Sequence, residues 1–181
     1  MPWRNGLGTT VEMAREDMAD GSGFAWRLSM ADVTSDGEFS NFSGYDRCLL
    51  LLEGNGLTLD CAGSVQRLEE PLQAARFRGE DPTFATLHDG PVKDFNIMTL
   101  RRHCSAHVDS QSHAQAARIE VDADLLLIYA VDTDLQLDSA DSGELLLPAR
   151  QLLMIRQPAR KTLHCKAGGY IATQIRLADS H

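Results

Sequence analysis

The sequence has no long hydrophobic run and no excess of basic side chains. Its longest apolar stretch, residues 125–131, has the length of a strand, whereas a helix that crosses a bilayer needs about 20 apolar residues. Acidic side chains outnumber basic ones by 26 to 17, which gives a formal net charge of -9. Nucleic-acid binding needs clustered Lys and Arg, and the pair Arg101-Arg102 is too small for this. The sequence therefore favours neither a membrane span nor a nucleic-acid partner.

Paired cysteines and an export signal are missing as well. The first residues, "MPWRNGLGTT", contain no apolar core of a secretory signal. The cysteines are widely spaced and form no Cys-x-x-Cys motif. We therefore expect a cytoplasmic protein with free thiols. The four cysteines are Cys48, Cys61, Cys104 and Cys165.

Common motifs of catalysis and cofactor binding are not found. The chain has no Gly-x-Ser-x-Gly elbow for a nucleophilic serine. Neither "NGLGTT" nor "EGNGLT" completes a dinucleotide-binding or phosphate-binding loop, so we interpret both as turns. The sequence identifies no nucleophile and no nucleotide cofactor, and the catalytic residues of any reaction stay unknown at this stage.

Histidine and cysteine gather in one segment, "RRHCSAHVDSQSH". There His103, Cys104, His107 and His113 lie within eleven residues. Nitrogen and sulfur donors suit zinc, and a His-x3-His pair can chelate a metal from one face of a helix. The segment lacks helical periodicity, however, and lies in a polar interval between two groups of strand candidates. We interpret it as a solvated loop rather than as a metal site.

Short alternating or apolar segments dominate the chain, and none has the periodicity of a long amphipathic helix. In "FAWRLSMADV", residues 24–33, apolar side chains fall on one face and Arg27, Ser29 and Ala31 on the other. Short strands at a spacing of 8–12 residues are typical of a β-sandwich or barrel. We therefore predict an all-β fold. The further strand candidates are residues 48–53, 57–60, 65–68, 74–77, 84–88, 92–99, 117–121, 125–131, 144–147, 151–155, 162–165 and 170–177.

Polar side chains occupy one face of the strand predicted at residues 92–99. Asp94, Asn96 and Met98 share this face, although Asp and Asn are depleted in strands. If the face points into a barrel, its polar groups need partners. A structural ion pair such as Arg47 with Asp94 would supply them, and a bound ligand would supply them equally well. The sequence leaves both interpretations open.

Three segments, in order and at similar spacing, resemble the HutD/Ves family. They are "PWRNGLGTTVEMA", "FAWRLSMADVTSDGEFSNFSGYDRCLLLLEGNGLTL" and "DFNIMTLRR", which together span residues 2–102, whereas the rest of the chain is similar only in strand rhythm. The resemblance implies an RmlC-like cupin fold in a bicupin arrangement. Residues 1–102 would form the first cupin-like half and residues 103–181 the second, packed with the first as one compact unit. Such proteins occur with histidine-utilisation genes or as a stress-induced protein, and their biochemical activity is not established.

The resemblance also suggests how the stretch at residues 38–54 differs from other cupins. In a cupin the corresponding stretch carries two histidines and a glutamate that hold a metal. Here the histidine positions fall on "FSNF", residues 39–42, and the carboxylate position falls near Asp46. Phe and Ser cannot replace imidazole as metal ligands. We therefore expect a cupin with no metal and no other cofactor.

What remains is a barrel mouth of aromatic rings, hydroxyl groups and an arginine, which suits an organic carboxylate. In this interpretation Arg47 makes the charge-assisted contact, Asn96 and Ser40 add hydrogen bonds, and Trp3 and Phe39 form apolar walls. Family members carry a further strand's length before the "PW-NG" motif, so we expect a shortened or missing edge strand beside Trp3. The candidate ligand-binding residues are Trp3, Asn5, Arg27, Ser29, Phe39, Ser40, Arg47, Asp94, Asn96 and Met98.

Three functions are compatible with this interpretation. The first is a non-catalytic protein that binds a small carboxylate, such as urocanate or formylglutamate, and regulates histidine utilisation or a stress response. The second is a metal-independent isomerase or hydrolase in which Arg47, Asp94 or a nearby histidine moves protons. The third is a protein-interaction scaffold, which a filled barrel and a large exposed apolar patch would favour. We favour the first, because the sequence identifies no acid–base pair; a homodimer stays open as the assembly state.

The purified protein is expected to carry no stoichiometric metal, because residues 39–42 supply no imidazole at the metal-ligand positions. Elemental analysis of protein prepared without chelators measures this directly. About one zinc, iron or nickel ion per chain would contradict the prediction and would point to His103 and His107 as ligands.

Overall fold

The computed structural model describes residues 8–113, 117–140 and 143–178, and the regular elements within these ranges are all β-strands. The chain divides into two compact units, residues 1–104 and 105–181. The all-β fold predicted from the short alternating segments is confirmed. Within the described ranges there is no apolar helix long enough to cross a membrane.

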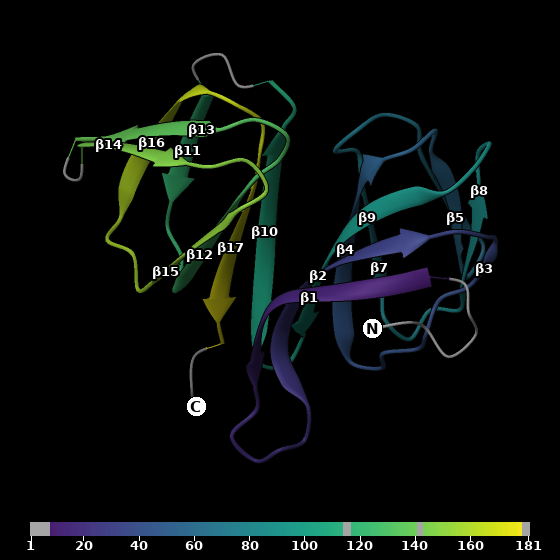
Figure 1. The fold of residues 1–181 in the computed structure, drawn as a ribbon. Coiled ribbons are helices and arrows are strands. Elements are labelled where there is room, and N and C mark those ends of the chain that lie inside the picture. Colours follow the sequence, from purple (N-terminus) through teal and green to yellow (C-terminus); the bar gives the residue numbers. More distant parts are fainter. Residues whose placement is uncertain (1–7, 114–116, 141–142, 179–181) are drawn as a thin grey trace. The chain divides into compact units, whose positions relative to one another are not determined.

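The first unit contains two antiparallel sheets that enclose one core, here called the first barrel (Figure 1). Its strands are β1 (Gly8–Asp17), β2 (Phe24–Val33), β3 (Gly37–Glu38), β4 (Tyr45–Glu53), β5 (Leu57–Cys61), β6 (Ser64–Leu68), β7 (Ala74–Arg78), β8 (Thr83–Leu87) and β9 (Val92–Leu100). One sheet has the order β1-β2-β9-β4-β7 and the other the order β3-β8-β5-β6. Leu49 and Leu51 of β4 pack with Leu57 and Leu59 of β5, so both sheets contribute to the core.

The second unit repeats this plan with two four-stranded antiparallel sheets. Its strands are β10 (Cys104–Gln111), β11 (Ala117–Val121), β12 (Leu125–Ala130), β13 (Leu135–Ser139), β14 (Gly143–Leu147), β15 (Leu152–Arg156), β16 (Lys161–Ala167) and β17 (Tyr170–Leu177). The sheet orders are β10-β17-β12-β15 and β11-β16-β13-β14. Leu126, Ile128 and Ile119 lie in an apolar core. The Tyr170 hydroxyl donates a hydrogen bond to Asp109 Oδ2 at 3.0 Å, so this tyrosine is satisfied within the unit.

One interpretation of the sequence is wrong, because much of the polar interval is a strand rather than a solvated loop. Residues 104–111 form β10, which is hydrogen-bonded to β17. Cys104 and Val108 are buried and lie four residues apart, so they share a face of the strand. Too few apolar residues alternate here for the pattern to be recognised. Strands β1, β3 and β13 were missed as well, although Leu135 and Leu137 alternate in β13.

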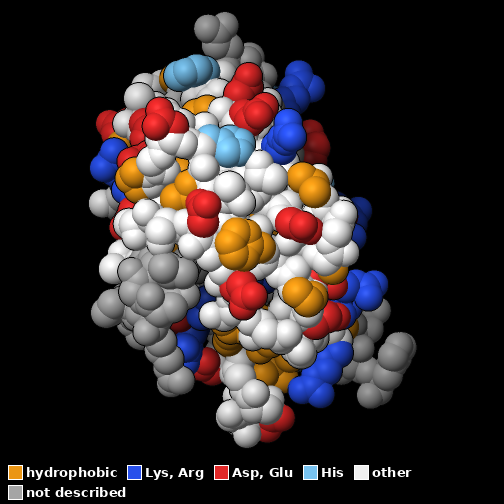
Figure 2. Space-filling model, turned by 90° about the vertical axis from the view of Figure 1, so that its right-hand side faces the viewer, with side chains coloured by type: hydrophobic (Ala, Val, Ile, Leu, Met, Phe, Trp, Pro, Cys, Tyr) orange, Lys and Arg blue, Asp and Glu red, His pale blue; other side chains and the backbone are white. Residues whose placement is uncertain are grey.

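Charged side chains of both signs are interspersed on the face of the molecule that Figure 2 shows. Hydrophobic side chains on this face mostly stand singly between polar ones, and no large basic patch is visible. The large hydrophobic side chains with high exposure among the described residues come from several different strands. They are Val11, Val65, Phe84, Leu145, Leu146, Met154 and Leu177.

The cysteines are expected to react slowly with thiol reagents in the native protein. All four are free and buried, and burial raises the pKa of each thiol, which lowers the fraction of reactive thiolate. A chromogenic disulfide reagent should therefore titrate four thiols per chain in denaturant but few in buffer. Fewer than four thiols in freshly prepared, denatured protein would contradict this prediction.

Candidate functional site

The two candidate arginines lie in one row across the inner face of the first barrel. Strand β9 runs between β2 and β4 (Figure 1). Met98 is paired with Arg27 on one side and with Arg47 on the other, and Arg47 is paired with Phe77 of β7. Directly opposed residues point to the same face of a sheet. Phe77 belongs to the barrel core, so the whole row faces the interior.

Two further rows continue this polar surface along β9. Asn96 lies between Ser29 of β2 and Leu49 of β4, and Asp94 is paired with Leu51. Since Leu49 and Leu51 are core residues, Asn96 and Asp94 also point into the barrel. The prediction that Asp94, Asn96 and Met98 share one face is confirmed, and this face points into the barrel.

Arg47 is a buried cation held by aromatic rings. Its side chain is 7% exposed, and its guanidinium carbon lies 5.2, 5.7 and 4.8 Å from the ring centres of Phe39, Phe42 and Phe77. Burial lowers the pKa of Arg47 to about 10, which the charge of Asp94 partly opposes, so the side chain stays protonated at neutral pH. Its Nε is buried and has no hydrogen-bond partner among the described residues. Stacking uses the face of a guanidinium, so the N–H groups at its edge stay available.

Arg27 has a similar environment next to Arg47. Its guanidinium carbon lies 5.2 Å from the ring centre of Phe24 and 5.3 Å from that of Phe42, which therefore contacts both arginines. Arg27 Nη2 donates to the sulfur of Met98 at 3.5 Å, which is a weak acceptor. Burial lowers the pKa of Arg27, and its Nε has no hydrogen-bond partner in the described ranges.

Asp94 and Asn96 present unpaired acceptors in the same interior. They are 2% and 8% exposed, and the Oδ1 atoms of both lack a hydrogen-bond partner within the part of the chain that the structure describes. Burial raises the pKa of Asp94 to about 7, although the charge of Arg47 opposes the shift. The two residues interact electrostatically but form no ion pair among the described contacts. The structural ion pair that would have satisfied both groups is therefore not formed there.

Four buried polar atoms without partners thus lie in one barrel, on Arg27, Arg47, Asp94 and Asn96. An unmet buried hydrogen bond costs about 1–3 kcal/mol, and more for a charged group. Folded proteins rarely retain such groups unless water or a ligand satisfies them. The interior of the first barrel is therefore the candidate binding site.

The structure brings some of the other candidate residues to this site and not others. Ser29 is buried in the row of Asn96, and Phe39 lies over Arg47. Ser40 is exposed and has no hydrogen bond to the described residues, so its predicted role beside Arg47 is not supported. Trp3 and Asn5 lie outside the described residues.

Sequence reasoning missed three rings that the structure places against the arginines, those of Phe24, Phe42 and Phe77. The alternation of β7 could have identified Phe77, because this strand has the burial pattern of a half-buried strand. Phe42 precedes β4 in a loop, where no periodicity indicates the direction of a side chain.

The segment with three histidines does not assemble a metal site in the described ranges. No group of three His, Cys, Asp or Glu side chains there could hold a metal ion. Cys104 is buried and its thiol donates to the carbonyl of Ala25 at 3.1 Å, whereas His107 on the same strand is exposed. The alternation of β10 thus separates two of the candidate ligands.

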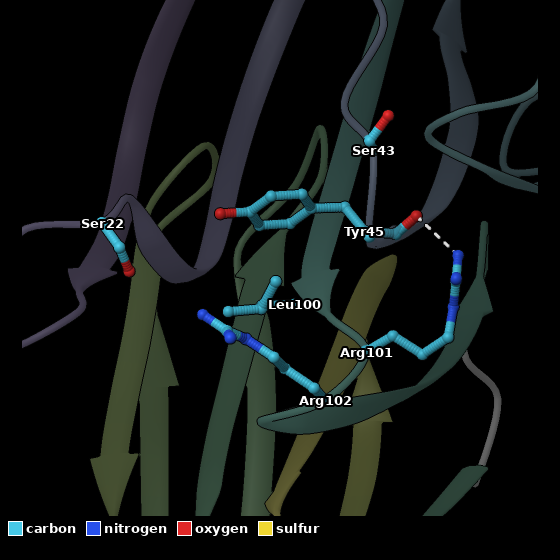
Figure 3. Close-up of a pocket in the computed structure, with 7 residues that line it drawn as sticks. Ser22, Ser43, Tyr45, Leu100, Arg101 and Arg102 are labelled. Carbon is cyan, nitrogen blue, oxygen red and sulfur yellow. Dashed lines mark hydrogen bonds between the residues drawn. The ribbon is translucent and has the colours of Figure 1, made fainter.

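An open pocket of about 530 Å³ lies elsewhere on the surface of the first unit (Figure 3). In Figure 3, Arg101 extends to the backbone carbonyl of Tyr45, and Arg102 lies beside Leu100. Arg101 also bonds to carboxylates, so its charge is already compensated. None of the buried unpaired side-chain atoms of the described residues lines this pocket, and we do not assign a site to it. The lining residues are Ser22, Ser43, Gly44, Tyr45, Leu100, Arg101 and Arg102.

The architecture is that of a bicupin of the RmlC-like superfamily, with two β-barrel halves in one chain. The structure is similar to a cupin 2 conserved barrel domain protein from Leptotrichia buccalis, with a TM-score of 0.58 and 7% identity over 94% of this chain and 89% of that chain. At this identity the similarity shows the fold alone.

The chain belongs to the HutD family, whose family model matches residues 1–173. HutD from Pseudomonas fluorescens SBW25, solved in a formate condition, is 28% identical with a TM-score of 0.86 over 98% of this chain and 93% of that chain. An uncharacterized 21.2 kDa protein in the hutC 3' region of Pseudomonas putida is 34% identical over 140 residues, 77% of this chain and 73% of that protein. Protein Ves of Escherichia fergusonii is 39% identical over 107 residues, 59% of this chain and 56% of that protein. The family match extends well beyond the segments that the sequence alone identified.

Ionisation of Asp94 is expected to lower the stability of the protein as the pH rises. The folded-state pKa of about 7 lies above the ordinary value of 3.8, so between these values the folded state holds a proton that the unfolded state has lost. The free energy of unfolding therefore falls from about pH 4 to about pH 7 and levels off above. Asp94→Asn removes this loss and should stabilise the protein by a few kcal/mol at pH 8 but little at pH 4.

Chemical denaturation at several pH values measures this difference. Asp32→Asn is the matched control, because Asp32 is the exposed carboxylate whose charge acts on Asp94. It should change the pH dependence only slightly. Identical pH profiles for Asp94→Asn and the parent protein would show that Asp94 does not titrate near neutral pH.

Proposed function

We propose that the first barrel binds a small organic carboxylate. The observation that carries this proposal is Arg47, a buried and charged side chain whose Nε has no hydrogen-bond partner among the described residues. Burying an uncompensated charge is costly, and the three rings around Arg47 offset this cost only in part. A bound anion would compensate the charge and accept hydrogen bonds from the free edge of the guanidinium.

A carboxylate fits this environment in geometry as well as in charge. The guanidinium fork matches the two oxygens of a carboxylate, and such charge-assisted bonds are stronger than neutral ones. Arg27 lies in the same row and adds a second positive charge. Asn96 and Ser29 of the next row offer an amide and a hydroxyl to the remainder of the ligand. The ring of Phe39 provides apolar contact area.

Urocanate and formylglutamate are the compounds that we propose first. Each carries a carboxylate, and both belong to histidine breakdown, with which HutD proteins are associated through their genes. We propose that the protein binds such an intermediate without converting it and thereby regulates histidine utilisation or a stress response. The proposal rests on family membership for the compounds and on the barrel interior for the carboxylate.

A metal-independent isomerase or hydrolase is the second candidate function. Asp94 favours it, because a buried carboxyl group with a pKa of about 7 is suited to accepting and returning a proton. Catalysis would need a partner for Asp94 in the proton transfer, and the charged groups that act on Asp94 are Arg47, which stays protonated at neutral pH, and the exposed Asp32. Incubation of the purified protein with each compound, followed by chromatography, tests for turnover.

A binding compound should raise the melting temperature of the protein. At a concentration 100-fold above its dissociation constant, a ligand stabilises the folded state by about 2.7 kcal/mol. For a chain of this size the melting temperature then rises by roughly 5–10 °C. A thermal-shift series with urocanate, N-formylglutamate and formate measures this. If no carboxylate in the series shifts the melting temperature at millimolar concentration, the proposed function is wrong.

Arg47→Lys should weaken carboxylate binding by about tenfold or more, because lysine keeps the charge but loses the planar fork. Arg47→Lys also perturbs the apoprotein less than Arg47→Ala, which would remove the positive charge that acts on Asp94. Arg160→Lys in the second unit is the control, since Arg160 is an exposed arginine in an ion pair with Asp122. Equal affinities of Arg47→Lys and the parent protein would place the binding site elsewhere.

A further inference from the structure

Phe42 is the ring that the two arginines of the candidate site share. Its centre lies 5.3 Å from the guanidinium carbon of Arg27 and 5.7 Å from that of Arg47. The two positive charges repel each other, and the charge of Arg27 contributes to the lowered pKa of Arg47. An aromatic ring attracts cations to its faces. The ring of Phe42 therefore holds the two guanidiniums at a defined separation despite their repulsion.

The backbone of Phe42 is fixed to the turn that follows β7. Its N–H donates to the carbonyl of Gly79 at 2.8 Å, and its carbonyl accepts from the N–H of Tyr45 at 3.1 Å. The N–H of Gly79 donates in turn to the carbonyl of Tyr45 at 2.7 Å. A Cβ atom at residue 79 would collide with the backbone of Phe42, so only glycine permits this approach.

An exposed ion pair between Arg101 and Glu80 is hydrogen-bonded to the same segment. Arg101 donates from Nη1 and Nη2 to the two carboxylate oxygens of Glu80 at 2.9 and 3.2 Å. Its Nε donates to Asp46 at 2.7 Å, and Nη2 also donates to the carbonyl of Tyr45, the bond drawn in Figure 3. Glu80 accepts a further bond from the N–H of Gly44 at 3.3 Å. Arg101 holds the pKa of Glu80 at about 2, so the ion pair persists at physiological pH.

We propose that Phe42 is a positioning residue of the carboxylate site and that the Arg101–Glu80 ion pair holds Phe42 in place. This inference rests on the proposed function of the first barrel and adds how the site is organised. Phe42 need not touch the ligand, because it acts by aligning the edges of Arg27 and Arg47. Residues 41–45, which are bonded to Gly79 and Glu80, transmit the effect of the ion pair to the ring. Such preorganisation raises affinity by lowering the ordering cost of binding.

Substitutions of Phe42 test the first part of this proposal. Phe42→Leu keeps an apolar side chain but removes the ring, and should weaken binding of N-formylglutamate or urocanate roughly tenfold. Phe42→Tyr restores the ring and should recover most of the affinity. Phe84→Leu, which removes an exposed ring from the same unit, is the control and should leave the affinity as in the parent protein. Isothermal titration gives the dissociation constants.

Glu80→Gln tests the role of the ion pair, because glutamine keeps the shape of the side chain and loses its charge. Binding should weaken severalfold although Glu80 contacts neither Arg27 nor Arg47. Glu144→Gln is the control, since Glu144 forms a more exposed ion pair with Lys166 in the second unit. This control substitution should change neither the affinity nor the NMR signals of the arginine side chains.

The arginine Nε–Hε resonances give a readout that does not require a ligand. Ring currents of Phe42 should shift the Arg27 and Arg47 signals, so both should move in Phe42→Leu and in Glu80→Gln. Unchanged signals together with parental affinity in Phe42→Leu would overturn the positioning role of Phe42. The same result in Glu80→Gln would overturn the role of the ion pair. If the parent protein binds neither compound, the proposed function fails, and the resonances alone decide whether Phe42 orders the arginines.

Discussion

The positive charge of Arg47 inside the first barrel is the constraint on which the surrounding structure depends. Three aromatic rings cover its guanidinium, yet cation–π contacts supply only about 0.5–2 kcal/mol each, less than the cost of removing an ion from water. The interior therefore keeps polar groups on the neighbouring strands. Asn96 and Asp94 each have an unpaired acceptor, and Arg47 has an unpaired donor at Nε. All three side chains point into the first barrel, so their unpaired atoms share one interior.

The second unit shows that the fold itself does not require this polarity. Its core residues are almost all apolar, and its buried tyrosine, Tyr170, finds a partner in Asp109. Two halves of similar architecture thus have different interiors, because only the first adds arginines among aromatic rings to its leucine core. The fold alone does not determine function, and the buried charged and amide side chains of the first barrel lie on β4 and β9.

The period of two in β2 and β9 made the inward face of the site predictable from the sequence. Asp94 and Asn96 stood out because these residue types are unfavourable in strands. The strand β10 could not be recognised, because its place in the sheet comes from pairing with β17 rather than from its own apolar residues. Ser40 and Phe42 show a second limit. Both lie in a loop, and the loop is held by hydrogen bonds of Phe42 to Gly79 and of Asn41 to Glu80, residues almost forty positions away.

The central position of β9 determines how rarely this strand opens compared with the loops around it. This strand is paired on both sides, and its residues from Asp94 to Leu100 are buried on both faces. Amide groups in such a strand exchange with solvent only when the whole unit opens, whereas loops open in far smaller steps. The segment that carries Phe42 is short and rests on a few hydrogen bonds. The inner face that β9 forms therefore stays fixed for as long as the unit is folded, whereas the segment of Phe42 can open in smaller steps.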